Sequence, residues 1–212
     1  MHKLQGSAWR SLITLAVFFS ATFAWCETPL SDPLFARGAG WQTTPVAASN
    51  GRDFLLVWID ARSGAEAIYA TRVAADGSVL DPEGILVSAP DQRAFEPSVA
   101  WVGNSWIVAW SGDRCQFRRI AADGRPDGSA QAIFGGSCRS PRVAASGETA
   151  IIAAYEAYVG VQVATIENTW PAVRPLGKVL GGPFDVACSR SDCVLAWLSY
   201  PRKLMARRIG PR

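Results

Sequence analysis

Acidic, basic and tyrosine side chains follow the short apolar runs of this sequence, and they are its best candidates for chemistry or ligand contact. They occur in three groups: Asp60 with Arg62, Asp113 with Arg114, and Glu156 with Tyr158. If the carboxylates converge, a pair of them about 5–9.5 Å apart could hydrolyse a glycosidic bond as acid and base or nucleophile. The same face could instead bind a ligand without any reaction. It could also be a solvated rim in which Asp60 and Arg62 pair with each other.

The N-terminus predicts a secretory signal peptide. Two basic residues precede residues 11–25, which carry no charge and are mostly apolar, but which form too short a run to span a bilayer comfortably. A small residue stands at each key position of a cleavage site that ends at Ala24. We therefore expect residues 1–24 to be removed during export. An uncleaved anchor is the alternative.

Removal of that peptide leaves a chain without histidine. The one histidine, His2, lies inside the peptide, so the mature chain cannot use Ser-His-Asp or Cys-His chemistry and lacks the commonest zinc ligand. The peptide carries basic but no acidic residues, so cleavage lowers the formal net charge of +3 towards neutrality. Such a surface has no basic footprint for nucleic acid and no polybasic patch for anionic lipid. We expect no cofactor, no metal, no nucleic-acid partner and no membrane span after cleavage.

A repeated segment organises the remaining chain, residues 25–212, as one domain. Each copy begins Val-Ala, passes a short polar turn and enters an apolar run that ends in an aromatic residue. The copies begin at Val46, Val99, Val143 and Val186, and their aromatic residues are Trp58, Trp110, Tyr155 and Trp197. Repeats of this length are typical of solenoids, propellers or arrays. We expect each aromatic residue to fill the same packing position between neighbouring units, with ligand stacking as the alternative.

Each repeat predicts four short strands, which we name A to D. In the first repeat, the tight-turn signals Asn50-Gly51 and Asp76-Gly77 separate apolar runs of strand length. Its strands are expected at 45–48, 54–58, 67–73 and 84–87. The second repeat has strands at 98–101, 106–110, 116–120 and 132–134, and the third at 143–145, 151–155, 161–166 and 178–180. The fourth has only three, at 186–187, 194–197 and 204–209.

The strand that the fourth repeat lacks has a counterpart at the N-terminus, in residues 33–37. Four-stranded antiparallel sheets can bury their apolar faces by stacking radially as blades. We therefore predict an all-β fold: a β-propeller of four four-stranded antiparallel blades, the last of which is completed by the N-terminal strand. The repeats span about 45–96, 97–140, 141–182 and 183–212. A fragment of a larger ring, or two chains that pair into an eight-bladed ring, are the alternatives.

The first repeat carries a longer motif than the other three. It contains Trp58-x-Asp60-x-Arg62-x-Gly64, Ile68-Tyr69-Ala70-x-Arg72-Val73, Asp76-Gly77, and Leu80-Asp81-Pro82-x-Gly84-Ile85-x-Val87-Ser88. This motif resembles a repeat of secreted bacterial β-propellers. The second repeat keeps only Trp110, Arg119 and Asp123-Gly124, and the later repeats keep less. The resemblance implies a propeller outside the cytoplasm and implies no reaction, because propellers host many functions.

Four of the five cysteines fall in pairs on the strand map. Cys188 and Cys193 flank the A–B turn of the fourth repeat. Cys115 follows a strand B, and Cys138 lies in the connection from strand D to the next strand A, at the same end of the strands. We predict the disulfides Cys115–Cys138 and Cys188–Cys193, which an oxidising compartment permits, with unpaired thiols as the alternative. Cys26 has no predicted partner. Lipid attachment would need a small residue before this cysteine, and Trp25 stands there instead.

The strand map places the B–C and D–A connections at one end of the strands, where propellers commonly bind ligands. The six polar residues described first lie in or beside the B–C loops. We favour a non-catalytic binding or scaffold module with a protein or cell-surface glycan partner, acting as a monomer or dimer in a secreted, periplasmic or cell-surface location. A lectin-like propeller is the alternative, although its loops have diverged where equivalent sugar sites would be alike. A glycoside hydrolase is the third hypothesis.

Overall fold

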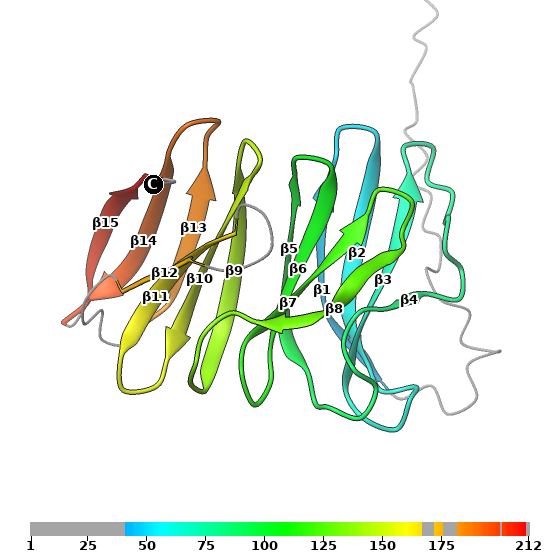
Figure 1. Ribbon diagram of the computed structural model, residues 1–212, viewed down its shortest axis with the longest axis horizontal. Helices are drawn as coiled ribbons and strands as arrows, with labels where there is room; N and C mark the ends of the chain where they lie inside the picture. The colour runs from blue at the N-terminus through cyan, green and yellow to red at the C-terminus, as the bar shows by residue number, and fades with distance from the viewer. Residues whose placement is uncertain (1–40, 167–171, 176–181, 200, 211–212) are drawn as a thin grey trace, which may run out of the picture.

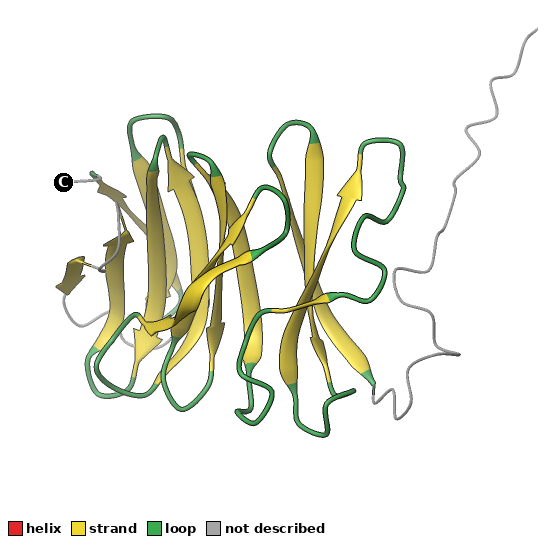
Figure 2. Cartoon of the chain, turned by 45° about the vertical axis from the view of Figure 1, so that its right-hand side comes forward, coloured by secondary structure: helices red, strands yellow, loops and turns green. Residues whose placement is uncertain are grey.

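The computed structural model describes residues 41–166, 172–175, 182–199 and 201–210, which form antiparallel β-sheets joined by loops (Figures 1 and 2). Blade 1 contains β1 (Gln42–Ser49), β2 (Asp53–Asp60), β3 (Ala67–Ala74) and β4 (Ile85–Leu86). Blade 2 contains β5 (Phe95–Val102), β6 (Ser105–Ser111), β7 (Gln116–Ala121) and β8 (Pro126–Ala132). Blade 3 contains β9 (Cys138–Ser146), β10 (Thr149–Glu156), β11 (Gly160–Ile166) and β12 (Ala172–Pro175). Blade 4 contains β13 (Phe184–Cys188), β14 (Cys193–Ser199) and β15 (Lys203–Ile209).

Within each blade, strands that follow one another in the chain lie side by side, so every blade is an antiparallel meander. Tight A–B turns make this possible. Gly51, Gly103 and Gly147 occupy the first three of these turns with φ angles of 89°, 60° and 61°, which glycine adopts without steric cost. In the fourth, Cys188 lies opposite Cys193 across the hairpin, and the two form the predicted disulfide.

The predicted A, B and C strands are confirmed where the described residues cover them, and the D strands of the first three repeats are corrected. The second-repeat strand expected at 132–134 is β8, which begins directly after the turn and ends at Ala132. Ile133 and Phe134 are buried beyond it, because they pack into the core between blades 2 and 3. The third-repeat strand expected at 178–180, which lies outside the described residues, is replaced by β12 at Ala172–Pro175 as the fourth strand of its blade. The expected strand at 33–37 also lies outside the described residues, so completion of the last blade by the N-terminal strand remains a prediction.

The first-repeat strand expected at 84–87 is reduced to the two residues of β4. The connection from β3 to β4 folds back on itself, with an isolated bridge between Val73 and Val79. The Thr71 hydroxyl also donates a hydrogen bond to the Asp81 carbonyl at 2.8 Å. These contacts satisfy part of the outer edge of β3, which leaves little of it for a regular fourth strand.

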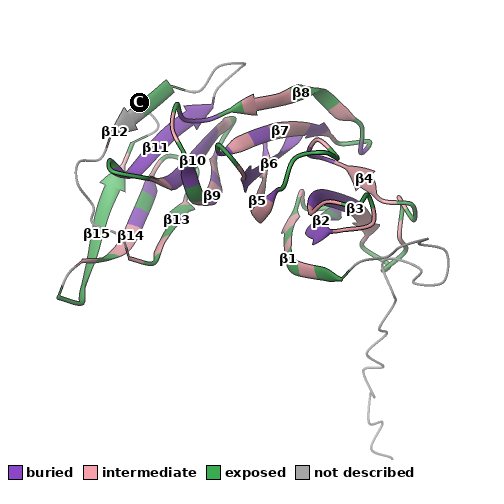
Figure 3. Ribbon diagram, turned by 90° about the horizontal axis from the view of Figure 1, so that it is seen from below, coloured by how far each residue is buried: buried purple, intermediate pink, exposed green. Residues whose placement is uncertain are grey.

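The blades stack face to face along an arc, with blade 1 and blade 4 at its opposite ends (Figure 3). We call the face of a blade that points to the next blade its forward face and the opposite one its backward face. Three apolar cores fill the three junctions, between blades 1 and 2, blades 2 and 3, and blades 3 and 4.

Strand B is the second strand of each blade and supplies residues to both faces, because successive side chains alternate. This explains why its apolar runs are nearly continuous.

The recurring aromatic residues do not all occupy one packing position, contrary to the sequence prediction. Trp110 packs in the core towards blade 1, and Trp197 packs in the core towards blade 3, so both lie on backward faces. Trp58 lies on the backward face of blade 1 with Tyr69. Tyr155, in contrast, packs in the core towards blade 4, on a forward face. A displacement of one residue in strand B reverses the face of a side chain, and Ala154 takes the backward position in blade 3.

Candidate binding face

Asp60 is the terminal residue of β2 and lies at the centre of a hydrogen-bond network. Its side chain has no exposed surface. The Arg62 guanidinium donates Nε and Nη2 to Asp60 Oδ2 at 2.9 and 2.6 Å, and the Arg62 backbone N–H donates to Oδ1 at 2.8 Å. Trp58 Nε1 and Gln42 Nε2 also donate to Oδ2, at 3.0 and 2.9 Å. Both carboxylate oxygens are therefore occupied by groups of the same blade.

The electrostatics of this network favour an ionised Asp60. Burial alone opposes the charge, but the hydrogen bonds from Arg62 and Trp58 outweigh it and lower the pKa of Asp60 below its ordinary value. The Arg62 guanidinium is fixed further by stacking 4.6 Å from the centre of the Tyr69 ring and by donating Nη1 to the Glu83 carbonyl at 2.9 Å. These contacts favour the hypothesis that Asp60 and Arg62 pair with each other and hold the B–C loop of blade 1.

A second carboxylate network, which the sequence reasoning missed, joins blades 2 and 3. Glu96 Oε2 accepts hydrogen bonds from the Ser111 hydroxyl at 2.6 Å and the Ser140 backbone N–H at 2.7 Å, and Oε1 accepts one from the Ser140 hydroxyl at 2.9 Å. Partial burial opposes ionisation, but these bonds and the positive charge of Arg142 outweigh it, so the pKa of Glu96 is lowered. The network clamps the first residues of β9 to blade 2.

A sequence signal for this network exists in the residues that precede each Val-Ala. Thr44, Glu96 and Ser140 each stand directly before a proline, and each has a positive φ, of 55°, 50° and 53°. Residues before proline favour extended backbone, and residues with side chains rarely adopt positive φ. The repeated X-Pro step therefore marks a strained bend, and irregular strand registers accompany it in blades 1, 2 and 3. In blades 2 and 3 this bend brings Glu96 and Ser140 together.

A disulfide links the two loops at the end of blade 2 where strand B stops. Cys115 and Cys138 form the predicted bond, with their Cα atoms 5.4 Å apart, and both residues are buried. The Cys115 carbonyl also accepts a hydrogen bond from the Ile133 N–H at 2.9 Å. Just before Cys115, Asp113 and Arg114 are exposed. Their side chains thus project from a loop whose backbone is covalently held.

The B–C hairpin of blade 3 lies next to this disulfide. The Ala157 N–H donates to the Ser137 carbonyl at 3.1 Å, and the Gly136 N–H donates to Glu156 Oε1 at 2.8 Å. Because Ser137 adjoins Cys138, the hairpin and the loop of Asp113 and Arg114 are held together. At the hairpin tip, Tyr158 has a φ of 68° and a completely exposed side chain, with a relative exposure of 101%.

We call the exposed part of these loops the loop platform. It consists of Asp113, Arg114, Tyr158 and Val159, with Glu156 at its base. The structure thus brings four of the six sequence-predicted residues to neighbouring loops, and it leaves Asp60 buried and Arg62 half-buried in blade 1. Of the three carboxylates considered for hydrolysis, Asp60 is enclosed by hydrogen bonds and Glu156 accepts a backbone N–H. Among the described residues, no group of three His, Cys, Asp or Glu side chains is placed to hold a metal ion.

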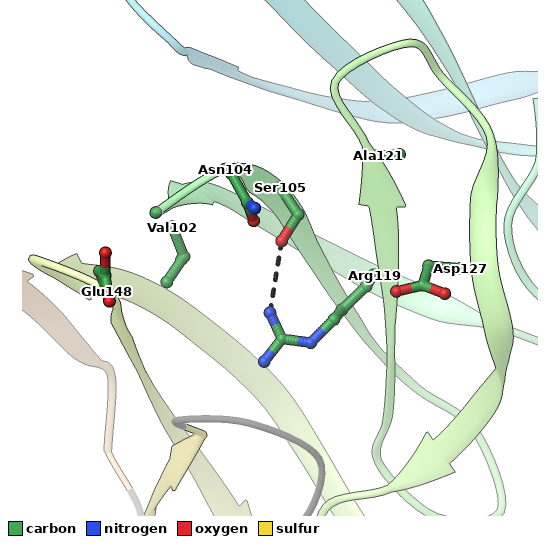
Figure 4. A pocket seen from close by; sticks show the side chains of 8 residues that line it. Val102, Asn104, Ser105, Arg119, Ala121, Asp127 and Glu148 are labelled. Carbon is green, nitrogen blue, oxygen red and sulfur yellow. Dashed lines mark hydrogen bonds between the residues drawn. The ribbon is translucent and has the colours of Figure 1, made fainter.

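A cleft of about 570 Å³ lies at the opposite end of blades 2 and 3, near their A–B turns (Figure 4). Arg119 points into it from β7 and donates Nη1 to the Ser105 hydroxyl at 3.3 Å. Asp127 of β8 and Glu148 of the β9–β10 turn lie at its margins and are exposed. The sequence reasoning noted Arg119 only as a repeat position and did not single out this cleft, because its residues come from several strands and turns that only the fold brings together.

Comparison with known proteins supports the fold and leaves the function open. No family model matches the chain, and no curated protein matches it. Among solved structures, an exo-1,5-alpha-L-arabinanase from a bovine ruminal metagenomic library is similar, with a TM-score of 0.50 and 11% identity over 80% of this chain and 74% of that chain. An alpha-L-arabinofuranosidase of Podospora anserina, in complex with cellotriose, has a TM-score of 0.49 and 10% identity over 85% of this chain and 67% of that chain.

A protein of unknown function from Bacteroides caccae has a TM-score of 0.46 and 15% identity, and this chain covers 59% of its length. The chain therefore spans only part of the solved structures that it resembles. At such identities the similarity shows the fold alone. Together with the radial stack of antiparallel sheets, it defines this chain as an all-β protein of the β-propeller class.

The disulfides and the described strands bear on where the protein resides. Two disulfides are typical of an oxidising environment outside the cytoplasm. Within the described ranges, no helix is long and apolar enough to cross a membrane.

Proposed function

We propose that this chain is a non-catalytic binding module, exported by its N-terminal signal peptide, that holds a protein partner on the loop platform of blades 2 and 3. The observation that carries this proposal is Tyr158, an aromatic ring that is fully exposed at the tip of a hairpin. Tyrosine is among the residues that contribute most to binding energy in protein interfaces. Arg114 lies on the neighbouring loop, and arginine also contributes strongly to binding energy in protein interfaces.

The platform is suited to binding because its backbone is already ordered. The Cys115–Cys138 disulfide and the hydrogen bond from Ala157 to Ser137 hold both loops in place. A partner therefore has to immobilise only side chains, at about 0.5–1.5 kcal/mol each, and not whole loops. A single projecting ring also fits a concave partner surface, which would bury it.

The contacts of the predicted carboxylates support a non-catalytic role over hydrolysis. A glycosidase needs one carboxyl group free to protonate the leaving group and a second free to act as base or nucleophile. Asp60 is enclosed by four donor groups, and Glu156 is engaged with the Gly136 backbone. Asp113, the third carboxylate, is exposed to solvent on the loop platform.

A glycan is the second candidate ligand, and one observation favours it. Tyr158 presents both faces of its ring beside the polar side chains of Asp113 and Arg114, and such a combination can stack on and hydrogen-bond to a sugar. We place it second because the corresponding loops of blades 1 and 4 carry different residues, so the sites are not repeated around the molecule.

The proposal is tested by affinity capture from envelope extracts of the source cell with the purified chain as bait. Tyr158→Ala should lose at least about nine-tenths of the captured partner, as expected for removal of an interface residue worth more than about 1.4 kcal/mol. Glu148→Ala is the matched control, since Glu148 is exposed on the other hairpin of the same blade, and it should capture as much as the unchanged chain. Equal capture by both variants would refute the platform. A glycan array probed with the same proteins then distinguishes a glycan from a protein partner.

A further inference from the structure

The junctions between blades are built from one repeated arrangement of residues on strand B. Two adjacent residues lie near the start of each strand B. The side chain of one points to the backward face of the blade, and that of the other points to the forward face. The forward residue shares an apolar core with the backward residue of the next blade. Three such pairs occur: Leu55 with Trp106, Ile107 with Ala150, and Ile151 with Cys193. All six residues are completely buried.

A second set of pairs follows two residues further along the same strands. These pairs are Val57 with Val108, Ala109 with Ile152, and Ala153 with Leu195. Again all six residues have no exposed surface. The three occupied junctions therefore share one geometry, although the side chains that fill them differ in size.

At the two ends of the arc, no described blade packs against the same positions. On the forward face of blade 4, Val194 has a relative exposure of 46% and Leu198 one of 38%. On the backward face of blade 1, Phe54 has a relative exposure of 43%. The residues equivalent to Val194 and Phe54 at the other junctions are fully buried, and those equivalent to Leu198 are buried Ile59 and Ser111 and half-buried Tyr155. In Figure 3, β15 at the blade 4 end is exposed along its length, at the far end of the arc from blade 1.

The exposed face of blade 4 carries a further apolar residue beyond strand B, in addition to Arg208, which lies opposite Val194. Alternation along β15 places Leu204, which lies opposite Leu198, on the same face, and Leu204 has a relative exposure of 76%. Apolar patches of this kind on a soluble protein mark contact surfaces. Blade 1 offers a partner surface, because exposed Phe54 and half-buried Leu56 alternate on its backward face, where buried Trp58 follows them.

We propose that a second copy of this chain occupies these faces. The forward face of blade 4 in one copy packs on the backward face of blade 1 in the other, with Val194 against Phe54. The contact continues the arrangement already present at three junctions, so it requires no new packing mode. Two copies related by a twofold axis make this contact twice and form a closed ring of eight blades with no open face.

The first test is the mass of the purified chain by native mass spectrometry at micromolar concentration. The mass of two chains is expected. The mass of one chain would overturn the proposal, and it would indicate that other residues of the same chain cover the faces. Masses of three or more chains would also overturn the two-copy ring.

The second test is a matched pair of substitutions to aspartate at two exposed valines. Val194→Asp places a charge in the proposed contact and should weaken dimerisation at least about 100-fold, since burying a carboxylate is strongly unfavourable and Arg208, which lies opposite position 194, is already paired with Asp192. Val173→Asp is the control, because Val173 of β12 is equally exposed, at 42%, and lies outside the contact. A dimer that tolerates Val194→Asp would refute this contact.

The third test does not depend on the aspartate variant being folded. Phe54→Cys and Val194→Cys are introduced together, and mild oxidation should give a disulfide-linked dimer with peptides 54 and 194 joined across chains. The pair Phe54→Cys with Val173→Cys should give no such product. Equal crosslinking of both pairs, or a 54–194 bond within one chain, would overturn the head-to-tail contact.

Discussion

Replacing Asp60 by asparagine removes one negative charge from a buried network while keeping the shape of the side chain nearly unchanged. Oδ2 of Asp60 accepts from Trp58, Gln42 and two nitrogens of Arg62, and Oδ1 accepts from the Arg62 backbone. Asparagine has one acceptor oxygen and one NH₂ group. Whichever way the amide is turned, its NH₂ group faces at least one N–H donor.

The expected cost follows from these contacts. Hydrogen bonds to charged groups contribute about 1.5–3 kcal/mol each, and a buried partner left unsatisfied costs more. Because the Arg62 side chain keeps 19% exposure, water can compensate part of the loss. We expect Asp60→Asn to lower the free energy of unfolding by about 3 kcal/mol, which corresponds to a decrease in Tm of roughly 6–12 °C for a domain of this size.

The effect should depend on pH. Because the pKa of Asp60 is lowered in the folded state, its contribution is fully present above the ordinary value of 3.8 and is lost as the pH falls through the folded-state pKa. The difference in Tm between the original chain and Asp60→Asn should therefore be constant at neutral pH and shrink in acid.

Thermal unfolding followed by circular dichroism between pH 2.5 and pH 7 measures this difference. Asp113→Asn is the matched control, since Asp113 is exposed. Its Tm should differ from that of the original chain by no more than a change of about 0.5 kcal/mol in the free energy of unfolding would produce. If both variants unfold at the same temperature as the original chain, the structural role assigned to Asp60 is wrong.

Three further predictions concern other parts of the molecule. Replacing Cys115 and Cys138 by serine should cost about 3 kcal/mol, as the chain-entropy model gives for a sequence separation of 23, and chemical unfolding in urea measures it. Glu96→Gln should cost about 1–3 kcal/mol at neutral pH, because its hydrogen bonds join two blades. Since the pKa of Glu96 is lowered, that cost should disappear as the pH falls through its folded-state pKa, as a urea series at acid pH would show. Tyr158→Ala should change the unfolding free energy by less than about 0.5 kcal/mol, because its side chain is fully exposed, and a larger loss would indicate a structural role.

Much of the fold could be predicted because its signals are local. Asn50-Gly51 marks a hairpin turn whichever surroundings it has. The positions of Cys115 and Cys138 on the strand map placed them at one end of the same blade, and the bond follows from that placement. Errors arose where neighbours decide the outcome, as at Ile133 and Phe134, whose burial between blades replaces the expected strand pairing.

The candidate site was harder to predict, because the role of a carboxylate depends on contacts from distant residues. Asp60 stands two residues after Trp58 and just before a loop, where a ligand-binding residue could also stand. In the structure, however, Gln42 and Arg62 enclose it. Glu96 was overlooked because its partners, Ser111 and Ser140, lie in other strands. The face of Tyr155 could not be read from its motif, since one residue of displacement in a strand reverses it.

Photo-crosslinking from position 158 tests the proposed binding role most directly. A photoreactive phenylalanine derivative is placed at Tyr158 of the blade 3 B–C hairpin, or at Glu148 of the A–B hairpin of the same blade, and the exported chain is irradiated in intact source cells. We predict one discrete protein adduct from position 158 and none from position 148. Adducts of equal yield from both positions, or an adduct from position 148 alone, would contradict the loop platform as the binding site.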